Sequence, residues 1–274
     1  MKLNEDKFEL ISHSYHKPNS NLILLKELPF SSVYNEYSTG NNLIISPSLY
    51  VRDLGVLVDY ELNWNCHITN LCKIGRKLSG WVLSVFYTRD AFTMLTLFNS
   101  IVRSKLEYCS QIWDPFLMKH ISAIEQIQQN FTKRIQSVQN LDYWERMEKL
   151  KIMSLQRRRE KLTIIYVWKI KNKHVPNDTN LEFLLNNRKS TSLALIKPMP
   201  RVTGKLLSMF ENSFHIKSAK LWNKLPHKLR QIDNLLTFKN QLDKYLTLIP
   251  DKPPIRGYYH LNKNSILDFN QQPF

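Results

Sequence analysis

Apolar residues recur every three or four positions through two long stretches of the chain, and this spacing limits the fold more than any other feature. In AFTMLTLFNSIVRSKLEY, residues 91–108, the repeat consists of Phe92, Leu95, Phe98, Val102 and Leu106. In MKHISAIEQIQQNFTKRIQSV, residues 118–138, it consists of Met118, Ile121, Ile124, Ile127, Phe131, Ile135 and Val138. A period near 3.6 places such residues on one side of an α-helix. We therefore expect two amphipathic helices whose stripes form a core rather than a cofactor site.

The pattern before residue 66 is different, because short apolar runs alternate there with turn residues. The runs NLILL, NLIIS and LYVRDLGVLVD, within residues 20–60, predict a small antiparallel hairpin or sheet. From about residue 66 the periodicity becomes helical. Further helices are expected over 155–173, with Ser154 as the N-cap, over 210–226 and over 234–246. The predicted fold class is α+β and predominantly helical.

The balance of charge is strongly basic. Lysine and arginine number 39 against 23 aspartates and glutamates, which leaves a formal net charge of +16. Such a surface attracts polyanions and releases their counterions on binding, so nucleic acid is the first partner to consider. The alternative is that the excess reflects solubility or the lysine and asparagine content of an AT-rich genome. The same two readings, a bound polyanion or a solvated face, apply to Arg157, Arg158 and Arg159 at the start of a predicted helix.

The common catalytic motifs are missing from the sequence. The six glycines stand apart and form no phosphate-binding loop, and neither Gly-x-Ser-x-Gly nor His-Glu-x-x-His occurs. Two-metal phosphoryl transfer needs carboxylates held close together, and the chain contains no Asp-Asp pair. Cys66, His67 and Cys72, with Cys109 or His120 as a fourth ligand, match no zinc spacing. We therefore expect no metal site, and thiols that are buried or free.

The compartment is predicted from the same features. Three cysteines are an odd number without a repeating spacing, which favours a reducing environment over a disulfide framework. The longest apolar run, LTIIYVW, is too short to cross a bilayer, and MKLNEDKFELI does not resemble a secretory signal. We expect an intracellular protein, nuclear or cytoplasmic, with no membrane partner.

The run DLGVLVDYELNWNCHI, residues 53–68, resembles the segment that closes the palm of non-LTR (LINE-type, jockey-like) retrotransposon reverse transcriptases. There an Asp-Leu-Gly-Val strand precedes a Leu-x-Trp-x-x-His turn into a helix. The family's thumb signature is similar to LFNSIVRSKLEYCSQIWDP in Val102, Arg103, Leu106, Glu107, Tyr108, Trp113 and Pro115. Further similar segments are MKLNEDKFELI, Tyr37 with Gly40 and Leu43, AIEQIQQNFTKRI, YWERMEKLKIMSLQRRR, FHIKSAKLWNKLP and TFKNQLDKYL. Each motif is weak alone, and their shared order over most of the chain carries the resemblance.

The resemblance implies a C-terminal fragment of an RNA-directed DNA polymerase. It implies the end of a palm in residues 1–62, a helical thumb in 63–140, a basic helical region in 141–248 and a loosely ordered tail in 249–274. The palm's metal-binding aspartates have no match, so the chain alone is expected to polymerise nothing and to hold no cofactor, with Mg²⁺ only in the complete polymerase. Lys7 matches a lysine suggested to be a general acid.

The resemblance also implies a partner, a template-primer duplex of RNA and DNA held through its phosphates without sequence readout. Leu54 and Gly55 match the primer-grip strand, where a residue without Cβ permits close approach; a β-bulge is the other reading of Gly55. Trp64 is expected to pack, and His67 to form a structural hydrogen bond. The expected phosphate contacts are Arg76, Lys77, Arg103, Lys105, Lys133, Arg134, Arg157, Arg158 and Arg159. Glu107 and Asp114 are expected to pair with such arginines.

Two other readings of the function stay open at this point. In the first, the chain is a domesticated, non-catalytic module that binds RNA, DNA or protein. In the second, it is a decayed transposon product without a function. In the polymerase reading, the fingers and the rest of the palm are a further expected partner. Salt-dependent RNA binding by a monomer would favour the module, whereas insolubility on expression would favour the decayed product, because a surface left uncovered is prone to aggregate.

Overall fold

The computed structural model describes residues 11, 48–177, 181, 194–195, 205–253 and 264–269. Within these residues the fold is α+β and predominantly helical, with a two-stranded antiparallel sheet, as predicted. The chain divides into two compact units, residues 1–70 and 71–274, and each is described by itself. The predicted segments met at residues 62/63 and 140/141, whereas the two units meet at 70/71.

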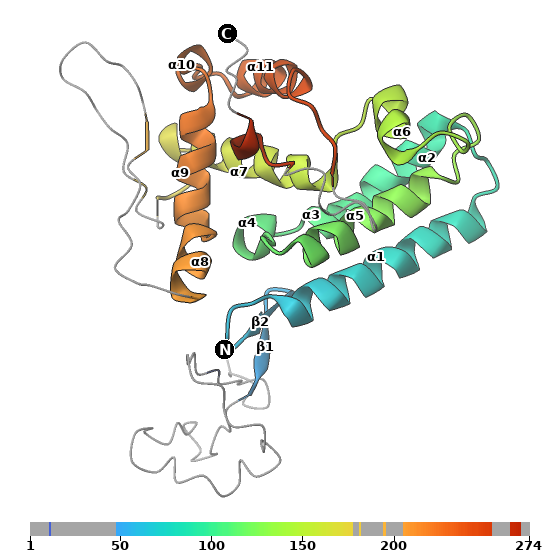
Figure 1. Cartoon of the computed structure of the whole chain (residues 1–274), viewed down its shortest axis with the longest axis horizontal. Coiled ribbons are helices and arrows are strands. Elements are labelled where there is room, and N and C mark those ends of the chain that lie inside the picture. The colour runs from blue at the N-terminus through green and yellow to red at the C-terminus, as the bar shows by residue number, and fades with distance from the viewer. Residues whose placement is uncertain are drawn as a thin grey trace, which may run out of the picture. The chain divides into compact units, whose positions relative to one another are not determined.

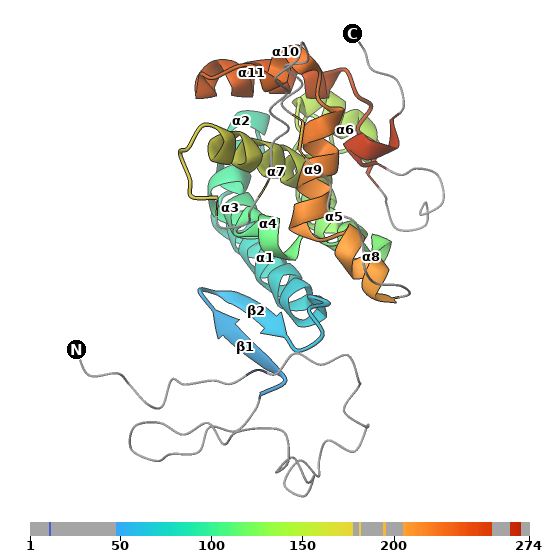
Figure 2. The ribbon, with the colours of Figure 1, turned by 90° about the vertical axis from the view of Figure 1, so that its left-hand side faces the viewer.

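The described part of the first unit is a β-hairpin followed by the start of a helix. Strands β1 (Tyr50–Asp53) and β2 (Val56–Asp59) pair antiparallel, with Asp53 opposite Val56, so Leu54 and Gly55 alone form the turn (Figure 2). Both turn residues have positive φ, 44° and 89°, as a type I′ turn requires. Gly55 therefore lies in a tight turn, so both predictions for it, a position inside a strand and a β-bulge, are wrong.

A capped turn leads from β2 into helix α1 (Asn65–Val85). The buried Asp59 accepts hydrogen bonds at Oδ1 from the backbone N–H groups of Glu61 and Asn63, at 3.1 and 3.0 Å. His67 Nδ1 accepts the Leu57 N–H at 3.2 Å, which ties the hairpin to the helix. The predicted structural hydrogen bond of His67 is confirmed. The role of Asp59 was not predicted, although an aspartate after an apolar strand is a known signal for such a turn.

The described part of the second unit is mainly helical (Figure 1). After the rest of α1 come α2 (Ala91–Leu97), a π-helical segment η4 (Phe98–Arg103), α3 (Ser104–Glu107), α4 (Ser110–Trp113), α5 (Met118–Thr132), α6 (Tyr143–Leu150) and α7 (Leu155–Lys171). The described C-terminal elements are α8 (Lys205–Glu211), α9 (Phe214–Lys224), α10 (His227–Arg230), α11 (Leu235–Thr247) and the 3₁₀ turn η5 (Ile266–Asp268). Ser154 caps α7, since its side chain accepts the Arg157 N–H at 3.0 Å, as predicted.

The buried residues of the first predicted stripe run through the π-helical segment. Phe98, Val102 and Leu106 are buried as predicted, and Met94 joins them, but Phe92 is 82% exposed. The buried residues thus repeat every four positions. Four residues exceed one turn of an α-helix, and the wider π turn keeps this repeat on one side. In the second stripe, the six residues from Ile121 to Val138 are buried as predicted, although α5 already ends at Thr132.

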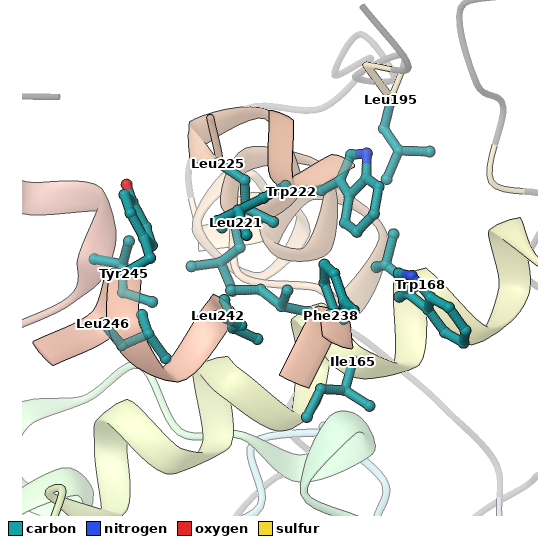
Figure 3. Packing of buried hydrophobic residues seen from close by; sticks show 14 of the residues in the cluster. Ile165, Trp168, Leu195, Leu221, Trp222, Leu225, Phe238, Leu242, Tyr245 and Leu246 are labelled. Carbon is teal, nitrogen blue, oxygen red and sulfur yellow. The ribbon is translucent and has the colours of Figure 1, made fainter. Parts of the chain in front are cut away.

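The larger core joins α7, α9 and α11. Trp168 of α7, Trp222 of α9 and Phe238 of α11 are fully buried and pack on one another, with ring centroids 5.6 Å apart for Trp168 and Phe238 and 6.1 Å for Trp222 and Phe238 (Figure 3). Ile266 of η5 is also fully buried in this core. Residues 264–269 are therefore packed against the helices, in contrast to the loosely ordered tail that was predicted for 249–274.

A buried carboxylate connects α5, α6 and α7. Glu125 accepts hydrogen bonds from the Tyr143 hydroxyl and from the Leu155 N–H, the latter at 2.9 Å. Burial raises the pKa of Glu125 to about 7, and the negative charge of Asp251 raises it further. The hydrogen bond from Tyr143 and the positive charge of Arg159 act in the opposite direction and lower the pKa. Because this network crosses the predicted boundary at 140/141, the helices on both sides of it belong to one folded unit.

Candidate nucleic-acid interface

Two of the three consecutive arginines at the start of α7 are buried. Arg157 and Arg159 are each 1% exposed. Arg157 donates from Nη2 to the carbonyl oxygens of Pro250 and Asn264, at 3.1 and 3.0 Å, and Arg159 pairs with Asp114 at 2.7 Å. Both side chains therefore lie on the buried side of α7. The run of three arginines in the sequence does not indicate which of them are buried. Arg157 and Arg159 are therefore removed from the predicted phosphate contacts, because neither guanidinium reaches the surface.

The acidic residues of the predicted thumb signature serve these basic side chains. Glu107 pairs with both Arg103 and Arg158, and Asp114 pairs with both Arg159 and Lys217. Burial disfavours the Asp114 carboxylate, but Lys217 and Arg159 outweigh this effect and lower its pKa. The predicted pairing of Glu107 and Asp114 with arginines is confirmed. The side chains of Arg103 and Arg158 pair with Glu107 and remain partly exposed to solvent, at 22% and 20%.

A first group of exposed cations lies where α1 crosses α3 and α5. A Cβ atom on Gly75 would come within 2.9 Å of side-chain atoms of both Leu106 and Ile127, so the three helices approach closely there. Arg76 and Lys77 follow Gly75 directly and are exposed, and the exposed Lys105 precedes Leu106. Three of the predicted contacts are thus brought to the same crossing.

Lys133 and Arg134 form a second exposed group, after the end of α5. The backbone N–H of Gln136 donates to the Arg89 carbonyl oxygen at 3.1 Å, so this segment lies beside the connection between α1 and α2. Arg89 itself donates from its guanidinium to the Leu83 carbonyl oxygen at 2.7 Å and thereby caps the end of α1. The second group therefore lies near the C-terminal end of α1, and the first group near its middle.

The remaining predicted site residues belong to the first unit. Leu54, 83% exposed, and Gly55 form the tip of the hairpin. A leucine with positive φ is uncommon, and such backbone costs about 1 kcal/mol or more and is found preferentially at functional positions. Lys7 and the matches at Tyr37, Gly40 and Leu43 lie outside the described residues. Trp64, predicted to pack, is partly buried and has a φ of 62°.

Sequence reasoning missed the character of the outward side of α1. The 21 residues of α1 contain no aspartate or glutamate. Lys73, Lys77, Trp81 and Val85 follow one another at intervals of four residues, and all are exposed, Trp81 to 50% and Val85 to 49%. The signal was present in the sequence, because residues four apart share one side of a helix. An exposed tryptophan, however, cannot be told from a buried one by spacing alone.

The described residues contain neither a metal-binding cluster nor a membrane-spanning helix. The part of the chain that the structure describes holds no group of three or more His, Cys, Asp or Glu side chains arranged to bind a metal ion. No helix within the described ranges is both long and apolar enough to cross a membrane. Comparison of the chain with family models, with curated proteins and with solved structures found no match.

Proposed function

We propose that this chain is the C-terminal part of a non-LTR retrotransposon reverse transcriptase and that it holds template-primer nucleic acid through phosphates, without catalysing synthesis by itself. The observation that carries the binding role is the outward side of α1, where Lys73, Arg76 and Lys77 are exposed on a helix without a single acidic residue. Cations arranged in this way interact with the phosphates of any sequence.

The motif resemblance supports the polymerase assignment. The ion pairs of Glu107 and Asp114 support a structural role for these two carboxylates. Paired carboxylates are required to hold two catalytic metal ions, and the sequence has no Asp-Asp pair. The role proposed for this chain is therefore to bind and position nucleic acid for active-site residues that lie elsewhere in a complete polymerase.

The binding role is tested with an Arg76→Ala/Lys77→Ala variant and a labelled RNA–DNA duplex. The matched control is Lys228→Ala/Lys244→Ala, which removes the same charge from exposed positions of α10 and α11. We expect the α1 variant to lower the slope of log affinity against log salt concentration by about 2, one for each lost phosphate contact, and the control to leave the slope unchanged. Equal slopes for both variants would contradict the role of α1.

The absence of catalysis is tested separately with the purified chain, a primed RNA template, Mg²⁺ and deoxynucleotides. We expect no template-dependent extension of the primer. Extension by the pure protein would overturn the non-catalytic part of the proposal, while binding without extension would agree with both parts.

A further inference from the structure

We propose that the outward side of α1 binds single-stranded nucleic acid, with a base stacked on Trp81 and the strand's backbone passing over Gly80. This inference rests on the proposed nucleic-acid function and deepens it, because it names the strandedness of the ligand at one place. The surface in question consists of Lys73, Arg76, Lys77, Gly80 and Trp81, all of which are exposed. It is called the α1 track below.

Trp81 is placed to act as a stacking platform. The other tryptophans described in the second unit are fully buried or only partly exposed, whereas Trp81 is 50% exposed. Its ring meets the Phe86 ring edge to face, with centroids 6.4 Å apart and an interplanar angle of 84°. Phe86 thus contacts the indole while half of the Trp81 surface remains exposed to solvent. Every base has a π-face, so stacking on such a ring is independent of sequence.

Gly80 gives the track a position without a side chain. A Cβ atom there would find nothing within 4 Å, so no neighbour in the fold requires a glycine. Glycine within a helix is nevertheless unfavourable compared with alanine, because it loses more conformational freedom on folding. Its use is to let another backbone approach closely. The exposed Ser84, one turn further on, is also small, so the approach remains open along the helix.

Charge decides the class of partner. Lys77 is four residues before Trp81 and Lys73 is four before Lys77, so two cations and the indole form one line on the helix, with Arg76 beside it. No acidic residue interrupts them within α1. A protein helix docked on Gly80 would need acidic groups to meet these cations, whereas every single strand supplies regularly spaced phosphates together with bases that can stack. An aromatic residue among cations is the usual arrangement for single-strand binding.

The track also continues toward more basic groups. Val85 extends the line to the end of α1, and the connection that follows carries Tyr87, which is 89% exposed. Lys133 and Arg134 lie near this connection, because the Gln136 N–H is bonded to the Arg89 carbonyl oxygen. A strand that stacks on Trp81 thus meets further cations at this end of the helix.

The test compares two probes, a 12-nucleotide single strand and the blunt duplex of the same sequence, by fluorescence anisotropy at fixed salt. Two variants interrupt the track without changing its charge, Trp81→Ala and Gly80→Leu. Their matched controls on exposed positions of α11 are Leu236→Ala, which removes an apolar side chain, and Gln241→Leu, which adds one. We expect each track variant to weaken single-strand binding about tenfold while duplex binding changes less than twofold, and the controls to leave both unchanged.

A second readout is the tryptophan fluorescence of the wild-type protein and of Trp81→Phe. Quenching by the single strand is expected in the wild type and is expected to disappear in Trp81→Phe, which retains a smaller stacking surface and most of the affinity.

The inference is overturned if the track variants bind the single strand as tightly as their controls do while duplex binding persists, a result that leaves the proposed function intact. If neither probe binds the wild type, the proposed function itself fails. If Gly80→Leu changes self-association instead of binding, the track is a protein interface and the inference is wrong.

Discussion

The buried Glu125 provides the sharpest test of how this fold is held together. Its carboxyl group has a pKa raised from 4.5 to about 7 by burial, so the folded protein retains a proton that the unfolded chain releases at lower pH. A difference of 2.5 pH units at about 1.36 kcal/mol each corresponds to about 3 kcal/mol. This contribution to stability is fully present below pH 4.5 and is lost as the pH rises toward 7.

The substitution Glu125→Gln removes this titration and retains a group that can bond Tyr143 and Leu155. We expect the variant to match the wild type in free energy of unfolding near pH 4.5 and to gain on it by about 3 kcal/mol above pH 7. Urea denaturation monitored by tryptophan fluorescence between pH 4.5 and 8 measures the difference. Glu148→Gln, at an exposed position of α6, is the control. If the difference between Glu125→Gln and wild type stays constant over this range, the carboxyl group does not titrate as argued.

Two further stability effects follow from local packing. Gly75→Ala and Gly80→Ala make the same change on α1, but only Gly75→Ala inserts a methyl group between Leu106 and Ile127. We therefore expect Gly75→Ala to have the lower free energy of unfolding, by about 1–3 kcal/mol, in urea denaturation. Equal stabilities of the two variants would contradict the close helix crossing. Ser154→Ala removes the N-cap of α7 and is expected to lower the free energy of unfolding by about 1–2 kcal/mol. An unchanged urea midpoint would show that the cap contributes nothing.

The helical core could be predicted from the sequence because its signal is local. Spacing in residues 118–138 identifies the six buried apolar residues from Ile121 to Val138, and Ser154 marks the start of α7. The exposure of Phe92 follows from the ordinary α-helical period, because Phe92 lies six residues before Phe98 in α2 and so points away from the side of the helix that Phe98 and Met94 bury. Gly55 was predicted inside a strand because Leu-Gly is an unusual pair for a two-residue turn.

The candidate interface was harder to predict than the core, because charge does not reveal which side of a helix faces inward. Arg157, Arg158 and Arg159 look equivalent in the sequence, yet the first and third are buried by contacts with residues distant along the chain, Asn264 and Asp114. Such contacts depend on tertiary packing and have no local signal. The pairing of Glu107 and Asp114 with arginines was predicted correctly, since few other roles suit isolated carboxylates in so basic a chain.

The most direct test of the nucleic-acid role is a salt titration of binding by the wild-type chain. Affinities for two RNA–DNA duplexes of unrelated sequence are measured between 50 and 200 mM salt, roughly the range over which counterion release dominates. Three exposed cations on α1 predict a slope of log affinity against log salt concentration of about −3 or steeper, with the same affinity for both sequences. A slope near zero, or a strong preference for one sequence, would contradict binding through phosphates.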